Sequence, residues 1–333
     1  MEGSEVQLQF FNYLKSILPR HVSLVDTVTN ILNLSQDSVY RRIRGETPLP
    51  LGELKLLCEK YNISLDQVLQ LKNNSIVFRD PSMDMDDKDF GLYLKGIIQQ
   101  LNHLNSFSKK EMFYLSKDLP IFYFFHFPEL AAFKMFFWIK SIFHHPDYRG
   151  KNFSIAEYPY RDYFLLGQQI IKLYNEIPSV EILNLESINS TIRQIEHYRD
   201  SGFFESKEDL ETVVNSMDML LQHIQKQVEK GQKFVYGAGE AGYRASIKFY
   251  INEVILGNNT ILFEMDGKRL SFINHIVLHY LITADEKFCA RVFQNFHTLV
   301  ASSTLISETG EKERNRFFKS LRERVRLCKN WNG

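Results

Sequence analysis

The spacing of hydrophobic residues divides the chain into two parts of unequal length. In the first 72 residues, apolar positions recur at helical spacing in five short segments, separated by serines, prolines and a glycine that are typical of caps and turns. The pattern therefore predicts a compact five-helix domain at residues 1–72. The expected helices cover residues 6–18, 24–32, 36–44, 51–61 and 64–71.

Beyond residue 90 the pattern again favours helices, with two exceptions. Residues 112–125 and 247–274 are rich in residues that favour strands, and Asp266-Gly267 in the second region is a strong hairpin signal. We therefore expect a mainly α protein, in which residues 90–330 form a larger, mostly helical domain with a small antiparallel β-sheet. Its expected helices are 90–105, 129–143, 162–176, 180–200, 207–230, 285–302 and 311–329.

Residues 73–89 differ in composition from both flanking parts. They contain two Asn residues, one Pro and five Asp residues. Turn-forming and acidic residues of this kind are typical of an exposed segment between domains. We interpret residues 73–89 as a linker.

The segment from Ser23 to Gly45 has the spacing of a helix-turn-helix. Two short helices are joined by three or four residues, each begins after a serine, and the second ends at a glycine. On a helical wheel of the second helix, Val39 and Ile43 form one apolar stripe, and Arg41 lies about 200° from Val39. We therefore expect the polar side of this helix to face away from the domain core.

The residues on that polar side suit contact with DNA. Arginine is the bidentate partner of guanine and glutamine that of adenine, whereas serine and tyrosine hydroxyls and helix N-termini reach phosphates. Exposed helices with a few arginines are common, so this helix alone favours DNA reading and an ordinary solvated face equally. The candidate DNA-binding residues are Ser35, Gln36, Asp37, Ser38, Tyr40, Arg41, Arg42 and Arg44.

A longer pattern extends through residues 23–71. The segment LGELKLLCEKYNISLDQVL follows a proline-containing loop, and small, polar and apolar residues stand at fixed places before it: Thr29, Asn33, Leu34, Ser35, Val39, Arg44 and Gly45. This pattern resembles the Cro/Xre-like helix-turn-helix of phage (lambda-type) repressors. The whole N-terminal part is also similar to bacterial regulators of the Bacteroidetes that carry a long helical C-terminal region.

The resemblance implies a sequence-specific transcriptional regulator that reads the major groove of double-stranded DNA with helix 36–44. It also implies a homodimer whose half-sites are about 34 Å, one helical turn, or a multiple of that apart. Val25 departs from the pattern, because many members of the family carry a phosphate-contacting Gln at that place. An alternative is a helix-turn-helix adaptor that binds other proteins.

The charge balance limits the DNA affinity that we expect, but it does not exclude DNA binding. Forty Lys and Arg residues balance forty Asp and Glu residues, and residues 1–72 carry eight of each sign. A wholly basic nucleic-acid binder is therefore excluded, but a local DNA-binding patch is not. We expect modest non-specific affinity for DNA.

Signals of secretion and of membrane insertion are not found in the sequence. The N-terminal segment MEGSEVQLQF has neither the basic nor the apolar region of a signal peptide, and the most apolar stretch, 121–143, contains charged residues. The three cysteines are widely spaced and odd in number, which favours free thiols in a reducing compartment. We expect a cytoplasmic protein without a membrane partner.

Two further patterns are weak. The GxGxxG match at Gly237–Gly242 follows a short apolar segment, but the surrounding elements do not fit a dinucleotide fold, so a nucleotide-binding enzyme is a less favoured alternative. His275 and His279 have the spacing of one helix face, yet no third metal ligand is evident. We expect no enzymatic activity, no cofactor and no metal.

The role of the second domain stays open between a sensor of a small-molecule or peptide effector and a dimerisation or partner-binding module. The aromatic run at 122–143 is expected to be core, with a ring-lined ligand pocket as the alternative. The last helix, 311–329, carries eight basic and three acidic residues, which fits a solvated face or a second phosphate- or dimer-contacting surface.

Overall fold

The computed structural model describes residues 3–18, 22–61, 63–69, 76–80, 90–157, 161–242, 244–253, 257–276 and 278–329. The chain divides into two compact units, Met1–Val77 and Phe78–Gly333. Of the predicted linker, residues 76–80 are described, whereas 73–75 and 81–89 lie outside the described residues.

The first unit contains the five helices that the hydrophobic spacing predicts. Their apolar sides meet in one core that includes Phe10, Phe11, Val28, Val39 and Leu57. The helices are α1 (Gly3–Ile17), α2 (Leu24–Leu32), α3 (Gln36–Ile43), α4 (Leu51–Tyr61) and α5 (Leu65–Val68).

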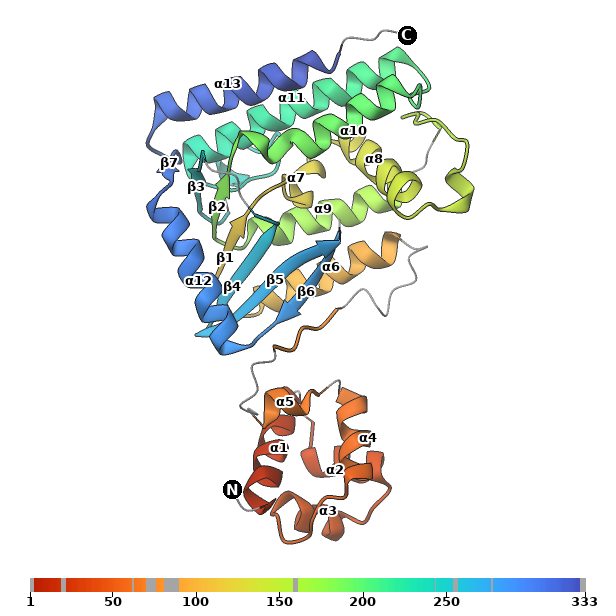
Figure 1. The fold of residues 1–333 in the computed structure, drawn as a ribbon, viewed down its shortest axis with the longest axis vertical. Helices are drawn as coiled ribbons and strands as arrows, with labels where there is room; N and C mark the ends of the chain where they lie inside the picture. Colours follow the sequence, from red (N-terminus) through yellow and green to blue (C-terminus); the bar gives the residue numbers. More distant parts are fainter. Residues whose placement is uncertain are drawn as a thin grey trace. The chain divides into compact units, whose positions relative to one another are not determined.

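The second unit is built on a seven-stranded sheet with the strand order β6-β5-β4-β1-β2-β3-β7 (Figure 1). The strands are β1 (Lys110–Leu115), β2 (Ser179–Leu183), β3 (Ile247–Ile251), β4 (Thr260–Met265), β5 (Lys268–Ile276), β6 (His279–Thr283) and β7 (Thr304–Leu305). The central strands β1, β2 and β3 are parallel neighbours, and the remaining pairs are antiparallel. The prediction of a small antiparallel sheet is therefore wrong, although most of the described residues are helical.

Parallel neighbours need long crossover connections, and helices supply them here. Between β1 and β2 the chain forms α7 (Ile121–Phe124), α8 (Pro128–Phe137) and α9 (Arg161–Asn175). Between β2 and β3 it forms α10 (Asn189–Asp200) and α11 (Lys207–Lys230). A π-helical turn, Trp138–Ile142, continues α8, and single 3-10 turns occur at Pro146–Tyr148, Leu185–Ile188 and Glu240–Gly242.

The missed strand β2 explains the wrong sheet prediction. All five of its residues are buried, so its sequence SVEIL shows no alternation of apolar and polar positions. Such a short run cannot be told from the start of a helix by periodicity, and the sequence predicted one continuous helix over 180–200. The expected strand at 112–125 is also too long, because the chain turns into α7 after Pro120.

Helices pack on both faces of the sheet (Figure 1). α12 (Glu286–Ala301) covers one face, where Phe293 and Phe296 contact Phe113 of β1 edge-to-face. The opposite face carries Met112 and Tyr114 and belongs to the main core, which also includes residues of α6 (Phe90–Asn105), α11 and α13 (Glu311–Leu327).

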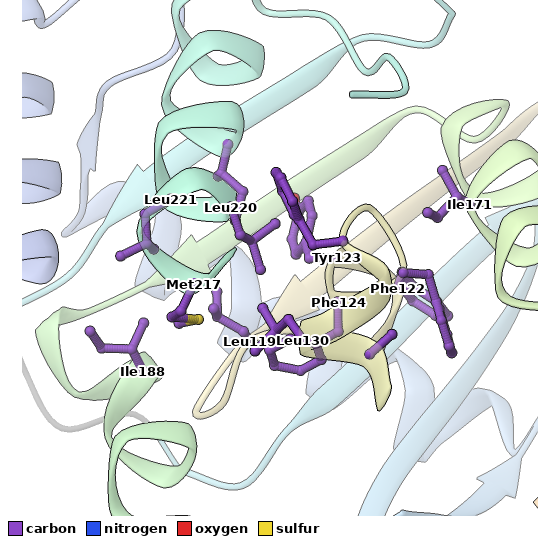
Figure 2. Packing of buried hydrophobic residues seen from close by; sticks show 14 of the residues in the cluster. Leu119, Phe122, Tyr123, Phe124, Leu130, Ile171, Ile188, Met217, Leu220 and Leu221 are labelled. Atoms are coloured by element: carbon purple, nitrogen blue, oxygen red, sulfur yellow. The ribbon is translucent and has the colours of Figure 1, made fainter. Parts of the chain in front are cut away.

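The aromatic run after β1 is part of this main core, as predicted. Figure 2 shows Tyr123 and Phe124 of α7 among aliphatic side chains of neighbouring helices, including Leu130, Met217 and Leu220. Both rings are at most 3% exposed. The run therefore anchors α7 and α8 to α11 and leaves little of its surface to solvent.

Candidate nucleic-acid interface

The helix-turn-helix at α2 and α3 is fixed by local caps. The Ser23 hydroxyl accepts a hydrogen bond from the Asp26 amide at 3.3 Å, and the Ser35 hydroxyl accepts one from the Ser38 amide at 3.3 Å. Asn33 ends α2 with a left-handed φ of 52°, which turns the chain toward α3. Because serine caps satisfy the first free amides of a helix, both helix starts follow from sequence alone.

The end of α3 depends on a glycine. Gly45 has a φ of +76°, and a Cβ built on it would lie 3.4 Å from the Ser4 Cβ of α1. A side chain at this position would therefore be strained by the backbone conformation, although its Cβ would make only an ordinary contact with α1. The predicted C-terminal glycine of the second helix is thus required by the observed turn.

The outward face of α3 matches the helical wheel. Val39 is fully buried, whereas Tyr40 is 48% exposed and the side chains of Arg41 and Arg44 are 56% and 59% exposed. Asp37 is exposed as well, and Ser38 is half-buried. The structure therefore brings the two arginines and Tyr40 together on one accessible side of the helix.

Three of the predicted residues at the start of α3 form hydrogen bonds with neighbouring side chains. Gln36 donates its amide to the Asp26 carboxylate of α2 at 3.1 Å, and the Ser35 hydroxyl donates to that of Ser38 at 3.0 Å. All of these groups are near the surface, so the contacts are exchangeable with water or a ligand. Gln36 nonetheless joins the first turns of the two helices.

Arg42 is placed differently from the other predicted residues. Its guanidinium pairs with both oxygens of the Glu53 carboxylate on α4, at 2.6 Å from Nε and 2.8 Å from Nη2. The two side chains are 13% and 21% exposed, so the pair is largely shielded from solvent. Arg42 thus braces α3 against α4 and does not share the exposed side of Arg41 and Arg44.

Glu46 lies beside the two exposed arginines. Its carboxylate is 3.2 Å from Nε of Arg44 and 3.9 Å from Nε of Arg41. The three side chains form a compact charged group at the C-terminal end of α3. This group carries one net positive charge. Glu46 was not among the predicted residues, although its position directly after the Arg44-Gly45 pair was the available signal.

Gln7 of α1 is a second residue of the interface that was not among the predicted ones. Its amide nitrogen donates to the carbonyl oxygens of Arg42 at 2.6 Å and Thr47 at 2.8 Å, and its amide oxygen accepts from the Leu49 amide at 2.8 Å. This single side chain therefore holds the loop that follows α3. No local pattern identifies it, because its partners lie 35 to 42 residues away.

The glycine-rich segment does not have the elements of a dinucleotide fold. Residues 233–236 form no strand, and Glu240–Gly242 is a single 3-10 turn instead of the start of a long helix. His275 and His279 lie on the antiparallel strands β5 and β6, not on one helix face. Within the described residues, no group of three His, Cys, Asp or Glu side chains is arranged to hold a metal ion.

The basic helix α13 is engaged with its own unit. Arg322 pairs with Asp218 of α11 at 2.9 Å, and Arg324 donates to the Leu185 carbonyl at 2.8 Å. The nearly buried Arg314 donates to the Ile306 and Thr309 carbonyls at 2.8 Å. These contacts favour a packing role for the basic residues of α13.

Three further features concern the whole chain. Cys58, Cys289 and Cys328 are free thiols. In the described residues, no helix is both long enough and apolar enough to cross a lipid bilayer. No curated protein and no solved structure shows significant similarity to the chain.

One comparison does find a relationship. Residues 20–96 match the model of the BetR domain, and this match includes both helices of the helix-turn-helix. It ends within α6, beyond the first unit. The match supports the helix-turn-helix prediction and a DNA-binding regulatory role; a Cro/Xre type in particular is not part of it. Residues 20–96 of the chain are thus similar to the BetR domain, a family of helix-turn-helix-like DNA-binding domains.

Proposed function

We propose that the protein is a sequence-specific transcriptional regulator that inserts α3 into the major groove of double-stranded DNA. The observation that carries this proposal is the exposed side of α3, where Tyr40, Arg41 and Arg44 project opposite the buried Val39. A recognition helix must keep one side in the core and offer side chains that reach base edges and phosphates on the other.

The roles of the individual residues follow from their placement. Arg41 and Arg44 contact guanine edges or phosphates. Tyr40 and the serines at the start of α3 contact the sugar-phosphate backbone of the DNA. Gln36 lies in the first turn of α3, where recognition helices contact bases. To contact a base, its side chain breaks the hydrogen bond with Asp26. Arg42 positions α3 through Glu53.

We further propose that the regulator acts as a homodimer on an inverted repeat. A single unit of five short helices presents few basic side chains, and the unit is electrically balanced over residues 1–72. Two linked copies would double the contacts and raise affinity without a more basic surface. Half-sites would then lie about one helical turn, or a multiple of it, apart.

Selection of binding sites from random duplex DNA by the full-length protein tests the proposal. We expect an inverted repeat to be enriched, and we expect Arg41→Ala and Arg44→Ala each to weaken binding by about tenfold or more. Lys60→Ala, which removes the same charge from the end of α4, is the matched control. The recognition-helix assignment is wrong if both arginine variants bind the selected site like the wild type.

A further inference from the structure

A cavity of about 660 Å³ lies within the second unit, between α6 and the face of strands β4, β5 and β6. Protein interiors are close-packed, and voids much larger than a water molecule are few. Pockets for small organic ligands, by contrast, have volumes of roughly 300–1,000 Å³. The volume of this cavity is therefore within the range of small-ligand pockets.

The lining of the cavity is mostly aliphatic and aromatic. The floor consists of side chains from four strands, including Tyr114 of β1 and Tyr280 and Ile282 of β6, and Ile121 and Phe122 of α7 also line the cavity. Phe122, the first residue of the aromatic run, thus lines the cavity and also belongs to the main core. Burial of apolar surface would dominate the binding of an occupant.

Three tyrosine hydroxyls are among the polar groups that line the cavity. The Tyr114 and Tyr280 hydroxyl oxygens are 3.3 Å apart, and Tyr93 of α6 donates to the Leu278 carbonyl at 3.1 Å. In the Tyr114–Tyr280 pair one hydroxyl donates to the other, so one hydrogen remains. Among the described residues no acceptor is seen for it, and a ligand oxygen would satisfy it.

Few ionisable side chains line the cavity. No acidic side chain is among them, Lys95 and His103 on α6 are exposed, and His279 of β6 is half-buried. Burial also raises the pKa of the Tyr280 hydroxyl to about 12, so the hydroxyl stays neutral. A charged group on the floor would lack a partner and would carry a large desolvation penalty.

We infer that this cavity binds an uncharged, largely hydrophobic small molecule whose carbonyl or ether oxygen accepts a hydrogen bond from the Tyr114–Tyr280 pair. This site is separate from the α3 surface, and it gives the second unit a role that does not depend on DNA. The BetR-like segment ends in α6, the helix that forms the cavity wall. An occupant therefore contacts the helix in which the matched segment ends.

Titration of the full-length protein with Nile red, in the absence of DNA, tests the inference. Nile red is a neutral hydrophobic dye with a carbonyl acceptor, and its emission shifts to the blue in apolar sites. We expect saturable binding of one dye per chain and displacement by 2-nonanone. Displacement by nonanoate at pH 8 should require a concentration at least about tenfold higher than that of 2-nonanone, because the carboxylate must lose its hydration to enter the cavity. Equal or better displacement by nonanoate would overturn the neutral ligand class.

Variants locate the site. Ile282→Trp places an indole in the cavity and should weaken dye binding by about tenfold or more, whereas Leu165→Trp, on an exposed part of α9, should not change it. Tyr280→Phe keeps the ring and should weaken binding about threefold to tenfold, while Tyr250→Phe on β3 is its control. Thermal unfolding reports whether each variant is folded.

The outcomes distinguish a dye bound in the cavity from a dye bound elsewhere on the protein. If Ile282→Trp fails to fold, Tyr280→Phe still decides, because it alters one hydroxyl only. Equal binding by Tyr280→Phe and Tyr250→Phe overturns the tyrosine contact. One dye per two chains, or dye release as the protein concentration rises, would place the dye between copies and overturn the cavity site. None of these results depends on whether the protein binds DNA.

Discussion

The guanidinium of Arg42 and the carboxylate of Glu53 face each other as a bidentate pair, with Nε 2.6 Å from Oε2 and Nη2 2.8 Å from Oε1. The pair connects α3 to the first turn of α4, and Gln7 holds the Arg42 carbonyl from the other side. The orientation of α3 therefore depends on contacts from two other helices. This dependence separates Arg42, which positions α3, from the exposed Arg41 and Arg44.

We expect Arg42→Ala to destabilise the first unit by about 2 kcal/mol, because it leaves a shielded carboxylate without its bidentate partner. Arg41→Ala should change the stability by less than about 0.5 kcal/mol, since Arg41 is exposed. Both tryptophans, Trp138 and Trp331, belong to the second unit, so their fluorescence does not report on α3. Hydrogen exchange of peptides from residues 36–61 measures the effect.

A double-mutant cycle with Glu53→Ala gives the control. The two single changes should be strongly non-additive, with a coupling energy of about 1–3 kcal/mol. Additive effects of Arg42→Ala and Glu53→Ala would mean that the observed pair does not hold α3 to α4. In that case Arg42 would return to the set of DNA-contacting candidates.

The sequence predicted this part of the chain well, because its signals are local. Ser23 and Ser35 bond amides three residues away, and Gly45 supplies its own backbone conformation. The helical wheel likewise needed only the period of α3 to place Val39 inside and Arg41 outside. The role of Arg42 was not predictable, because its partner lies eleven residues on, in the next helix.

The second unit was predicted less well, because its signals are not local. β2 looks like the start of a helix until β1 and β3 are seen on either side of it. Tyr114 and Tyr280, which meet on the floor of the cavity, are separated by 166 residues. The aromatic content predicted a hydrophobic core, but it could not predict where a cavity lies beside that core.

Glu46 provides a second prediction, which depends on the proposed function. We expect Glu46→Gln to raise affinity for non-specific duplex DNA by about threefold to tenfold, because it removes a negative charge beside Arg41 and Arg44. The dependence of binding on salt should steepen, since two arginines would be free to displace counterions. Fluorescence anisotropy at several salt concentrations measures both effects.

Glu59→Gln is a suitable control, because it removes the same charge from an exposed position on α4. Weaker and less selective binding by Glu46→Gln would contradict the prediction. That result would instead assign Glu46 a base contact, since a carboxylate accepts a hydrogen bond from the amino group of cytosine.

A third prediction concerns the buried ion pair between Glu181 of β2 and Lys233. Nζ of Lys233 is 3.9 Å from Oε1 of Glu181, and both side chains are fully buried. Glu181 also accepts hydrogen bonds from the hydroxyls of Tyr123 and Ser179, each at 2.8 Å. The pair is therefore part of a polar network inside an apolar core, where loss of one partner is costly.

We expect Lys233→Met to destabilise the second unit by about 3–5 kcal/mol at pH 6. The pH matters because burial lowers the pKa of Lys233 to about 7, so the ammonium is present only below that value. Adding Glu181→Gln should restore part of the loss, since the amide no longer needs a cation. Urea unfolding followed by Trp138 fluorescence tests this, and a double variant no more stable than Lys233→Met would contradict it.

The last prediction concerns acid stability and a pair of buried histidines. The rings of His126 and His223 are 4.3 Å apart, and Nδ1 of His126 accepts a hydrogen bond from the Tyr236 amide at 3.3 Å. Burial lowers the pKa of His223 from 6.5 to about 4, and that of His126 is lowered by burial and by His223. Both rings are therefore neutral in the folded protein at pH 6.

The sign of the effect follows from these directions. As the pH falls from about 6.5 to 4, the unfolded chain binds protons that the folded protein does not, so the free energy of unfolding decreases. For His223 alone the loss approaches about 3 kcal/mol at pH 4. We expect His223→Gln to flatten the fall of the thermal unfolding midpoint between pH 6.5 and 4, whereas His197→Gln, at an exposed site on α10, should leave it unchanged. Equal pH dependence in the wild type and His223→Gln would show that His223 does not contribute to acid stability.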